Sequence, residues 1–61
     1  MMNYSIKTVD GNRYDYYRQD GAPAFDKEDE DGIEIIDKHG TRRMFLRRNI
    51  VSVTARREDN A

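Results

Sequence analysis

The chain has 61 residues, no cysteine and one histidine, and its formal charge is −1. A chain of this length forms one domain at most, and it buries only about 60% of the surface that its unfolded form exposes. Disulfides are excluded, and no apolar run is long enough to cross a membrane as a helix. We therefore expect one soluble, cytoplasmic domain, residues 1–61, whose marginal core is supplemented by self-association or by a partner.

The charges are unevenly distributed along the chain. Residues 1–37 hold four basic and ten acidic side chains, whereas residues 38–61 hold seven basic and two acidic ones. The acidic excess is greatest in residues 26–31, and six arginines lie within residues 42–57. Such segregation bears on partners, solubility and association rather than on the fold.

The N-terminal third predicts a β-hairpin. Residues 4–9 and 13–18 alternate with period two, and the Asp-Gly-Asn sequence at 10–12 between them is typical of a hairpin turn. In the second of these strands, Tyr16 lies on one face and Tyr17 on the other.

The next segment breaks the alternation with Gly21, Pro23 and a run of acidic residues. A helix over residues 23–30 is disfavoured, because its acidic residues would lie at the negative end of the helix dipole. We predict that residues 18–31 form a mobile acidic loop with at most one helical turn and little effect on stability. Replacing residues 26–31 by a Gly/Ser linker should then leave the melting temperature nearly unchanged.

The C-terminal half predicts three further strands and a polar tail. The strands are residues 33–37, 41–48 and 50–55, and residues 56–61 are expected to fray. In residues 41–48 we expect Met44 and Leu46 to face the core.

Five short strands predict an all-β fold, a small five-stranded antiparallel barrel with little helix and the acidic loop between strands two and three. The predicted core is Tyr4, Ile6, Tyr16, Ile33, Ile35, Met44, Leu46, Ile50, Val51 and Val53. If Leu46 is a core residue, Leu46→Ala should cost about 2–5 kcal/mol.

Residues 32–53, GIEIIDKHGTRRMFLRRNIVSV, resemble the second half of Sm-like and other SH3-like small barrels. The resemblance implies a hairpin of strands three and four, followed by a single tight turn at residues 47–49 and strand five at residues 50–53. The chain departs from the Sm-like pattern in its acidic insertion and in lacking an N-terminal helix. No binding residue is carried over from the family, because a fold alone does not give a function.

The sequence shows no catalytic, cofactor or metal signature, so we do not expect an enzyme. When the acidic run is aligned on an EF-hand loop with Gly32 as its glycine, the first and last ligand positions are Lys27 and Lys38. A lysine side chain cannot bind Ca²⁺ at these two positions. His39 has neither a cysteine nor a second histidine with which to bind zinc.

The strongest candidate for a binding surface is the arginine–aromatic segment. If Met44 and Leu46 point inward, Arg43, Phe45 and Arg47 form an outward stripe that Tyr17 could extend. Arginine and aromatic side chains suit phosphate contacts and base stacking. Alternatively, the arginine stems cover the aromatic ring, and the guanidinium groups pair internally with Asp15, Glu34 or Asp37.

Two functional hypotheses follow. In the first, the chain is a small binding module that engages a protein partner or a second copy through this stripe, the acidic loop or both. Phe45→Ala should then weaken binding and leave the fold intact. In the alternative, the stripe binds single-stranded nucleic acid, although the net charge of −1 counts against it. A phage or mobile-element origin is consistent with a chain of this kind.

Overall fold

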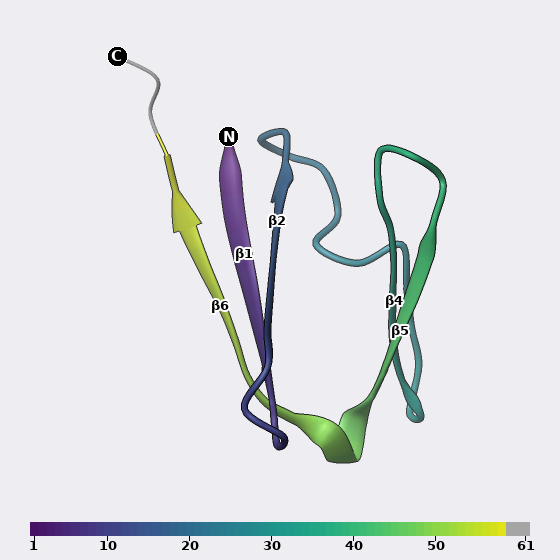
Figure 1. The fold of residues 1–61 in the computed structure, drawn as a ribbon. Helices are drawn as coiled ribbons and strands as arrows, with labels where there is room; N and C mark the ends of the chain where they lie inside the picture. Colours follow the sequence, from purple (N-terminus) through teal and green to yellow (C-terminus); the bar gives the residue numbers. More distant parts are fainter. Residues whose placement is uncertain (59–61) are drawn as a thin grey trace.

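The computed structural model describes residues 1–58, which form two three-stranded antiparallel sheets (Figure 1). In the first sheet the strand order is β2-β1-β6, and in the second it is β3-β4-β5. The elements are β1 (Met2–Thr8), β2 (Arg13–Arg18), β3 (Lys27–Glu28), β4 (Gly32–Ile36), β5 (Arg42–Leu46), the 3-10 turn η1 (Arg47–Asn49) and β6 (Ile50–Arg57). The turn η1 connects the two sheets at one end of the molecule.

The prediction of an all-β fold is confirmed, and that of a closed five-stranded barrel is wrong. There are six strands in two sheets, and no ladder joins the sheets within residues 1–58. The additional strand β3 lies in the predicted acidic loop, where Lys27 pairs with Glu34 and Glu28 with Ile33. Because β3 and β5 occupy both edges of β4, β2 cannot pair with β4 at these positions.

Helix is limited to η1 among the described residues, so the predicted turn at residues 47–49 is present and residues 23–30 form no helix. No helix in this part of the chain is long and apolar enough to cross a membrane. Within the predicted tail, Arg56 and Arg57 belong to β6 and the Glu58 N–H donates to the Met1 carbonyl. The rest of that tail, residues 59–61, lies outside the described residues.

Both predicted hairpin turns are present and depend on local chemistry. Gly11 and Gly40 have φ values of 87° and 81°, which side-chain-bearing residues rarely adopt. In the β4–β5 turn, the Asp37 carboxylate accepts hydrogen bonds from the backbone N–H groups of His39 and Thr41 at 2.9 and 3.0 Å.

The core lies between the two sheets. Its buried residues are Ile6 and Tyr16 from the first sheet and Ile33 and Ile35 from the second. Partly buried apolar residues pack around them, namely Tyr4, Tyr14, Phe25, Phe45 and Ile50. The rings of Tyr4, Tyr16, Tyr14 and Phe45 follow one another with centroid separations of 5.3, 5.7 and 5.6 Å. Such ring pairs stabilise a core beyond the area that they bury.

Four predicted core residues lie on the surface instead. Met44, Leu46, Val51 and Val53 have exposed fractions of 70%, 40%, 63% and 40%. In β5 the cause is the register, which pairs Arg43 with Ile35 and Phe45 with Ile33. Directly paired residues share a face of the sheet, so Phe45 follows the buried isoleucines inward and its neighbours point outward. The alternation of β5 is confirmed. The prediction of which of its two faces points into the core was wrong.

This register makes Leu46→Ala a mild substitution. We expect it to lower the free energy of unfolding by only about 1 kcal/mol or less, because Leu46 is 40% exposed and does not belong to the buried core. Chemical denaturation of the two proteins measures the difference. A cost of about 2–5 kcal/mol, typical of a buried leucine, would return Leu46 to the core and contradict the register.

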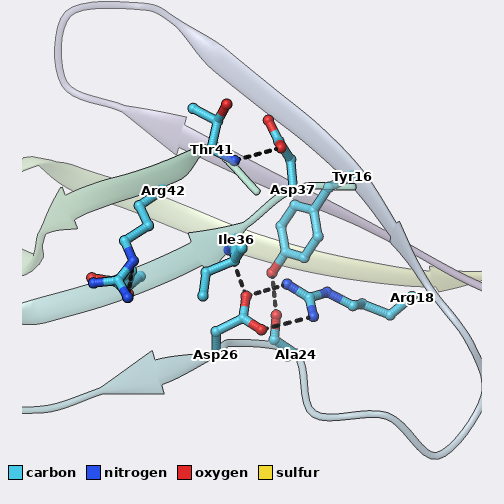
Figure 2. Close-up of polar contacts among 9 residues, drawn as sticks. Tyr16, Arg18, Ala24, Asp26, Ile36, Asp37, Thr41 and Arg42 are labelled. Atoms are coloured by element: carbon cyan, nitrogen blue, oxygen red, sulfur yellow. Dashed lines mark hydrogen bonds and ion pairs between the residues drawn. The ribbon is translucent and has the colours of Figure 1, made fainter. Parts of the chain in front are cut away.

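A polar contact joins the acidic segment to both sheets (Figure 2). The Arg18 guanidinium donates to both carboxylate oxygens of Asp26 at 3.2 and 2.6 Å, and the Ile36 N–H donates to the same carboxylate at 2.6 Å. We call these three residues the Asp26 clamp. Beside it, the Tyr16 hydroxyl donates to the Ala24 carbonyl at 2.7 Å, and burial raises the pKa of Tyr16 to about 12. The clamp therefore links β2 to the end of β4 at Ile36, beyond the residues of β4 that pair with β3.

These contacts involve residues 18–31, the predicted acidic loop. Its mobility stays a prediction. Asp29 accepts hydrogen bonds from the backbone N–H groups of Asp31 and Gly32, which closes the turn between β3 and β4. Together with the Asp26 clamp, this gives the segment structural roles that a Gly/Ser linker would not supply. We therefore expect its replacement to lower the melting temperature, contrary to the expectation from sequence.

Candidate functional site

A cleft of about 620 Å³ lies between the β1–β2 turn and β5. The turn contributes Val9, Asp10 and Asn12, and β5 contributes residues 43–46. We call this feature the β5 cleft. It forms because the register of β5 turns Phe45 toward Tyr14 and leaves Met44 and Leu46 beside the opening.

Aromatic rings and one arginine form the inner part of the cleft. Tyr14 and Phe45 pack with their centroids 5.6 Å apart, and the Arg43 guanidinium carbon lies 5.0 Å from the Tyr14 centroid. A guanidinium at this distance is attracted to the ring face, which fixes its position without neutralising its charge. Within residues 1–58, Arg43 forms no ion pair with a carboxylate. Its positive charge is thus available to a ligand.

The outer part of the cleft is apolar and exposed. Val9 has an exposed fraction of 64%, and Met44 and Leu46 are exposed on the opposite side. Large apolar side chains scattered singly are common on protein surfaces, but three around one cleft are a feature of binding sites.

Hydrogen bonds hold the turn on the other side of the cleft. The Asp10 carboxylate accepts from the Thr8 hydroxyl and from the Asn12 side-chain amide, the latter at 2.9 Å. The Val9 N–H donates to the Asn49 carbonyl at 2.9 Å, which ties the turn to η1. The hydrogen bond from the Thr8 hydroxyl is the main cause that lowers the pKa of Asp10 below its ordinary value. Both walls of the cleft are therefore defined before a ligand binds.

The four residues predicted to form one outward surface lie in three places. Arg43 and Phe45 line the β5 cleft on the inner side of their sheet. Arg47 lies in η1, where its guanidinium donates to the Asp29 carbonyl at 2.8 Å and lies 3.5 Å from Glu28. Tyr17 is 55% exposed and lies on β2, on the face opposite the buried Tyr16. The predicted stripe therefore does not exist as a single surface.

Internal pairing accounts for part of the charge segregation. Arg42 lies 4.0 Å from Glu34 and Arg57 lies 3.3 Å from Asp20, in addition to the contact of Arg47 with Glu28. Each pair joins the basic half of the chain to the acidic half. The segregation of charge along the sequence thus corresponds partly to contacts within one molecule. Of the three predicted carboxylate partners, Glu34 is the one that pairs with an arginine of residues 42–48.

Sequence reasoning missed Val9, Met44 and Leu46 as site residues. Alternation alone does not say which face is buried, and the sequence therefore predicts Met44 and Leu46 in the core. Val9 carried a signal, since an apolar residue next to an Asp-Gly turn has few neighbours on which to pack. Its position at the end of a hairpin indicates that Val9 is exposed. It does not indicate that β5 lies on the other side of the cleft.

Within the described residues, no group of three or more His, Cys, Asp or Glu side chains is placed to hold a metal ion. His39 is exposed in the β4–β5 turn, and Asp29 uses its carboxylate on backbone N–H groups. Comparison of the chain with protein-family models, with curated proteins and with solved structures finds no match.

Proposed function

We propose that the chain is a non-enzymatic protein-binding module whose β5 cleft receives an extended segment of a partner. The observation that carries this proposal is the charged Arg43, stacked on Tyr14 inside a cleft with exposed Val9, Met44 and Leu46 at its opening. Arginine, aromatic residues and methionine are enriched where the energy of protein interfaces is concentrated.

The backbone of β5 supports an extended ligand. β5 is an edge strand, and the Arg47 N–H donates to the Asp31 carbonyl just beyond its end. The alternation of antiparallel hydrogen bonds then directs the backbone groups of Arg43 and Phe45 toward β4 and those of Met44 and Leu46 toward the free edge. A peptide strand can add to such an edge through its main chain, while pockets select its side chains.

The cleft also defines the side chains that would fit. An apolar side chain would contact Phe45, Leu46 and Val9, and a neighbouring carboxylate would pair with Arg43. We therefore expect a segment in which an acidic residue lies next to an apolar one. Phe45→Ala is not a clean test of this site, because Phe45 packs against Tyr14 and the core.

Peptides selected from a random displayed library against the wild-type chain provide the test. We expect the selected sequences to share the acidic–apolar pair, and Arg43→Glu or Leu46→Asp to weaken their binding about tenfold or more, as for central interface residues. Arg48→Glu is the matched control, since Arg48 lies in η1 and does not line the cleft. Fluorescence polarisation measures the affinities, and thermal melting confirms that each variant folds.

Three outcomes contradict the proposal. They are a selection that yields no binder, selected peptides whose affinity is unchanged by Arg43→Glu and Leu46→Asp, and an equal loss in Arg48→Glu. The first two reject the cleft as a protein-binding site. The third attributes the effect to overall charge instead of to the position of Arg43.

Single-stranded nucleic acid is the weaker candidate. Its premise was an outward Phe45 between arginines, whereas Phe45 is turned toward Tyr14. The exposed Tyr17 lies on a different sheet from Arg43, so the two side chains do not form one stacking surface.

We also propose that the fold is an opened relative of SH3-like small barrels. The β4–β5 hairpin and the single 3-10 turn before the last strand support this kinship. The kinship implies no function of its own.

A further inference from the structure

We infer that the free edge of β6 pairs with β6 of a second copy, antiparallel and about a two-fold axis at Val53. β6 lies at the edge of the first sheet, as Figure 1 shows, and its eight residues make it the longest strand of the described chain. This surface is separate from the β5 cleft, which none of the residues of β6 lines.

The backbone of β6 presents unused hydrogen-bonding groups along this edge. The Glu58 N–H donates to the Met1 carbonyl, so antiparallel alternation directs the backbone groups of Ser52 and Thr54 toward β1. The N–H and C=O groups of the residues between them point away from the sheet. Such a row of donors and acceptors is a template on which another extended strand can replace water.

The edge of β6 also lacks the features that keep sheet edges apart. Natural edge strands are guarded by charged side chains, proline or bulges. The other edge strands carry charges, with Arg13, Asp15 and Arg18 in β2, Lys27 and Glu28 in β3, and Arg42 and Arg43 in β5. In β6 the charges, Arg56 and Arg57, are confined to the C-terminal end, and residues 50–55 contain neither charge nor proline, although 38% of the whole chain is charged. Its irregular pairing with β1 is confined to its first residues.

The sequence of β6 is complementary to itself when it is reversed. With the axis at Val53, Val53 meets its own copy, Val51 meets Ala55, and Ser52 meets Thr54. Apolar residues thus oppose apolar ones and hydroxyls oppose hydroxyls, while Arg56 meets Ile50 and no like charges are opposed. Val51 and Val53, now 63% and 40% exposed, gain cover in this arrangement. This self-complementarity identifies a second copy, and not an unrelated strand, as the occupant.

Sedimentation velocity over a wide concentration range tests the inference. We expect a wild-type dimer that Val53→Lys abolishes, because two lysines would meet at the axis. Val9→Lys is the matched control, since Val9 is an exposed valine outside β6, and it should leave the dimer intact. If Val53→Lys does not fold by circular dichroism, Ala55→Lys makes the same test at an exposed position of the same strand.

Amide hydrogen exchange locates the contact. On dimerisation, protection should rise at Val51, Val53 and Ala55 and stay unchanged at Ser52 and Thr54, which already bond to β1. A wild-type chain that stays monomeric, a dimer that survives both lysine variants, or new protection on β5 instead of β6 would overturn the inference. Peptide binding by the β5 cleft should be unaffected by Val53→Lys, so the two proposals fail independently.

Discussion

Gly32→Ala is expected to lower the stability of the fold strongly. A Cβ at Gly32 would overlap the carbonyl oxygen of Phe45 and would lie 3.1 Å from its carbonyl carbon and 3.2 Å from the Leu46 Cα. All three atoms belong to the backbone of the paired strand, so no side chain can move aside. Overpacking a close contact costs about 1–3 kcal/mol and sometimes more, and here β4 must separate from β5.

The expected cost of Gly32→Ala is large relative to the free energy of unfolding of the whole chain. At about 0.05–0.15 kcal/mol per residue, a chain of this size has about 3–9 kcal/mol in all. Gly40→Ala is the control, because nothing lies within 4 Å of a Cβ there and only its φ of 81° opposes the substitution. That strain costs about 1–2 kcal/mol. Circular dichroism and amide chemical-shift dispersion compare the variants, and a Gly32→Ala protein at least as stable as Gly40→Ala would refute the close approach.

Asp26→Asn should be the most damaging exchange of a charged residue for its neutral isostere. It removes the charge that the Arg18 guanidinium contacts at two oxygens, and it weakens the acceptor for the Ile36 N–H. The Arg18 and Asp26 side chains are only 18% and 26% exposed, so water replaces these contacts poorly. We expect a loss of about 2 kcal/mol, within the range for hydrogen bonds to charged groups.

Glu34→Gln provides the matched control for this prediction. Glu34 faces Arg42 at 4.0 Å, and the Arg42 side chain is 73% exposed, so the change should stay within about 0.5 kcal/mol. Urea denaturation at neutral pH measures both variants. Equal effects in the two would mean that the Asp26 clamp does not hold the sheets together.

The pH dependence gives a second readout of the Asp26 clamp. The hydrogen bonds from Arg18, and then that from the Ile36 N–H, hold the pKa of Asp26 below its ordinary value of 3.8. The unfolded chain therefore binds this proton more readily, and the contribution of Asp26 to stability is present above the ordinary pKa and is lost as the pH falls through the folded pKa. The difference in melting temperature between wild type and Asp26→Asn should be full at about pH 7 and shrink toward about pH 2. A constant difference would show that the charge of Asp26 is not involved.

Much of the fold could be predicted because its signals are local. Period-two alternation and the Asp-Gly turn define β1 and β2, and Gly40 marks the turn between β4 and β5. The direction of β5 could not be predicted in the same way, because apolar side chains occur on both of its faces. Phe45 is selected for the interior by long-range pairing with Ile33 and by the ring of Tyr14.

The strand β3 was also beyond local reasoning. Lys27 and Glu28 have no strand signal of their own, and they pair with β4 because Asp29 closes the turn and Asp26 contacts Arg18. A dense run of acidic residues predicts solvation, whereas here two of its carboxylates accept backbone hydrogen bonds. The Asp29 contacts are local, whereas those of Asp26 depend on Arg18 and Ile36, eight and ten residues away, which composition does not reveal.

The candidate site was predicted in part. Arg43 and Phe45 were identified by residue type, and both line the β5 cleft. The Arg47 guanidinium instead contacts the Asp29 carbonyl and Glu28, and Leu46 lines the cleft instead of belonging to the core. Residue types thus indicate the chemistry of the site. Which side chains lie together in it depends on how the strands pair.

The most direct test of the proposed function is the change in amide chemical shifts when a selected acidic–apolar peptide is titrated into the labelled chain. We expect the largest shifts on the two walls of the β5 cleft, at Val9 and Asn12 and from Arg43 to Leu46. Small shifts are expected at Ser5 and Thr54, which lie on a separate surface of the first sheet. Shifts concentrated at Ser5 and Thr54, with β5 unchanged, would rule out the β5 cleft as the binding site.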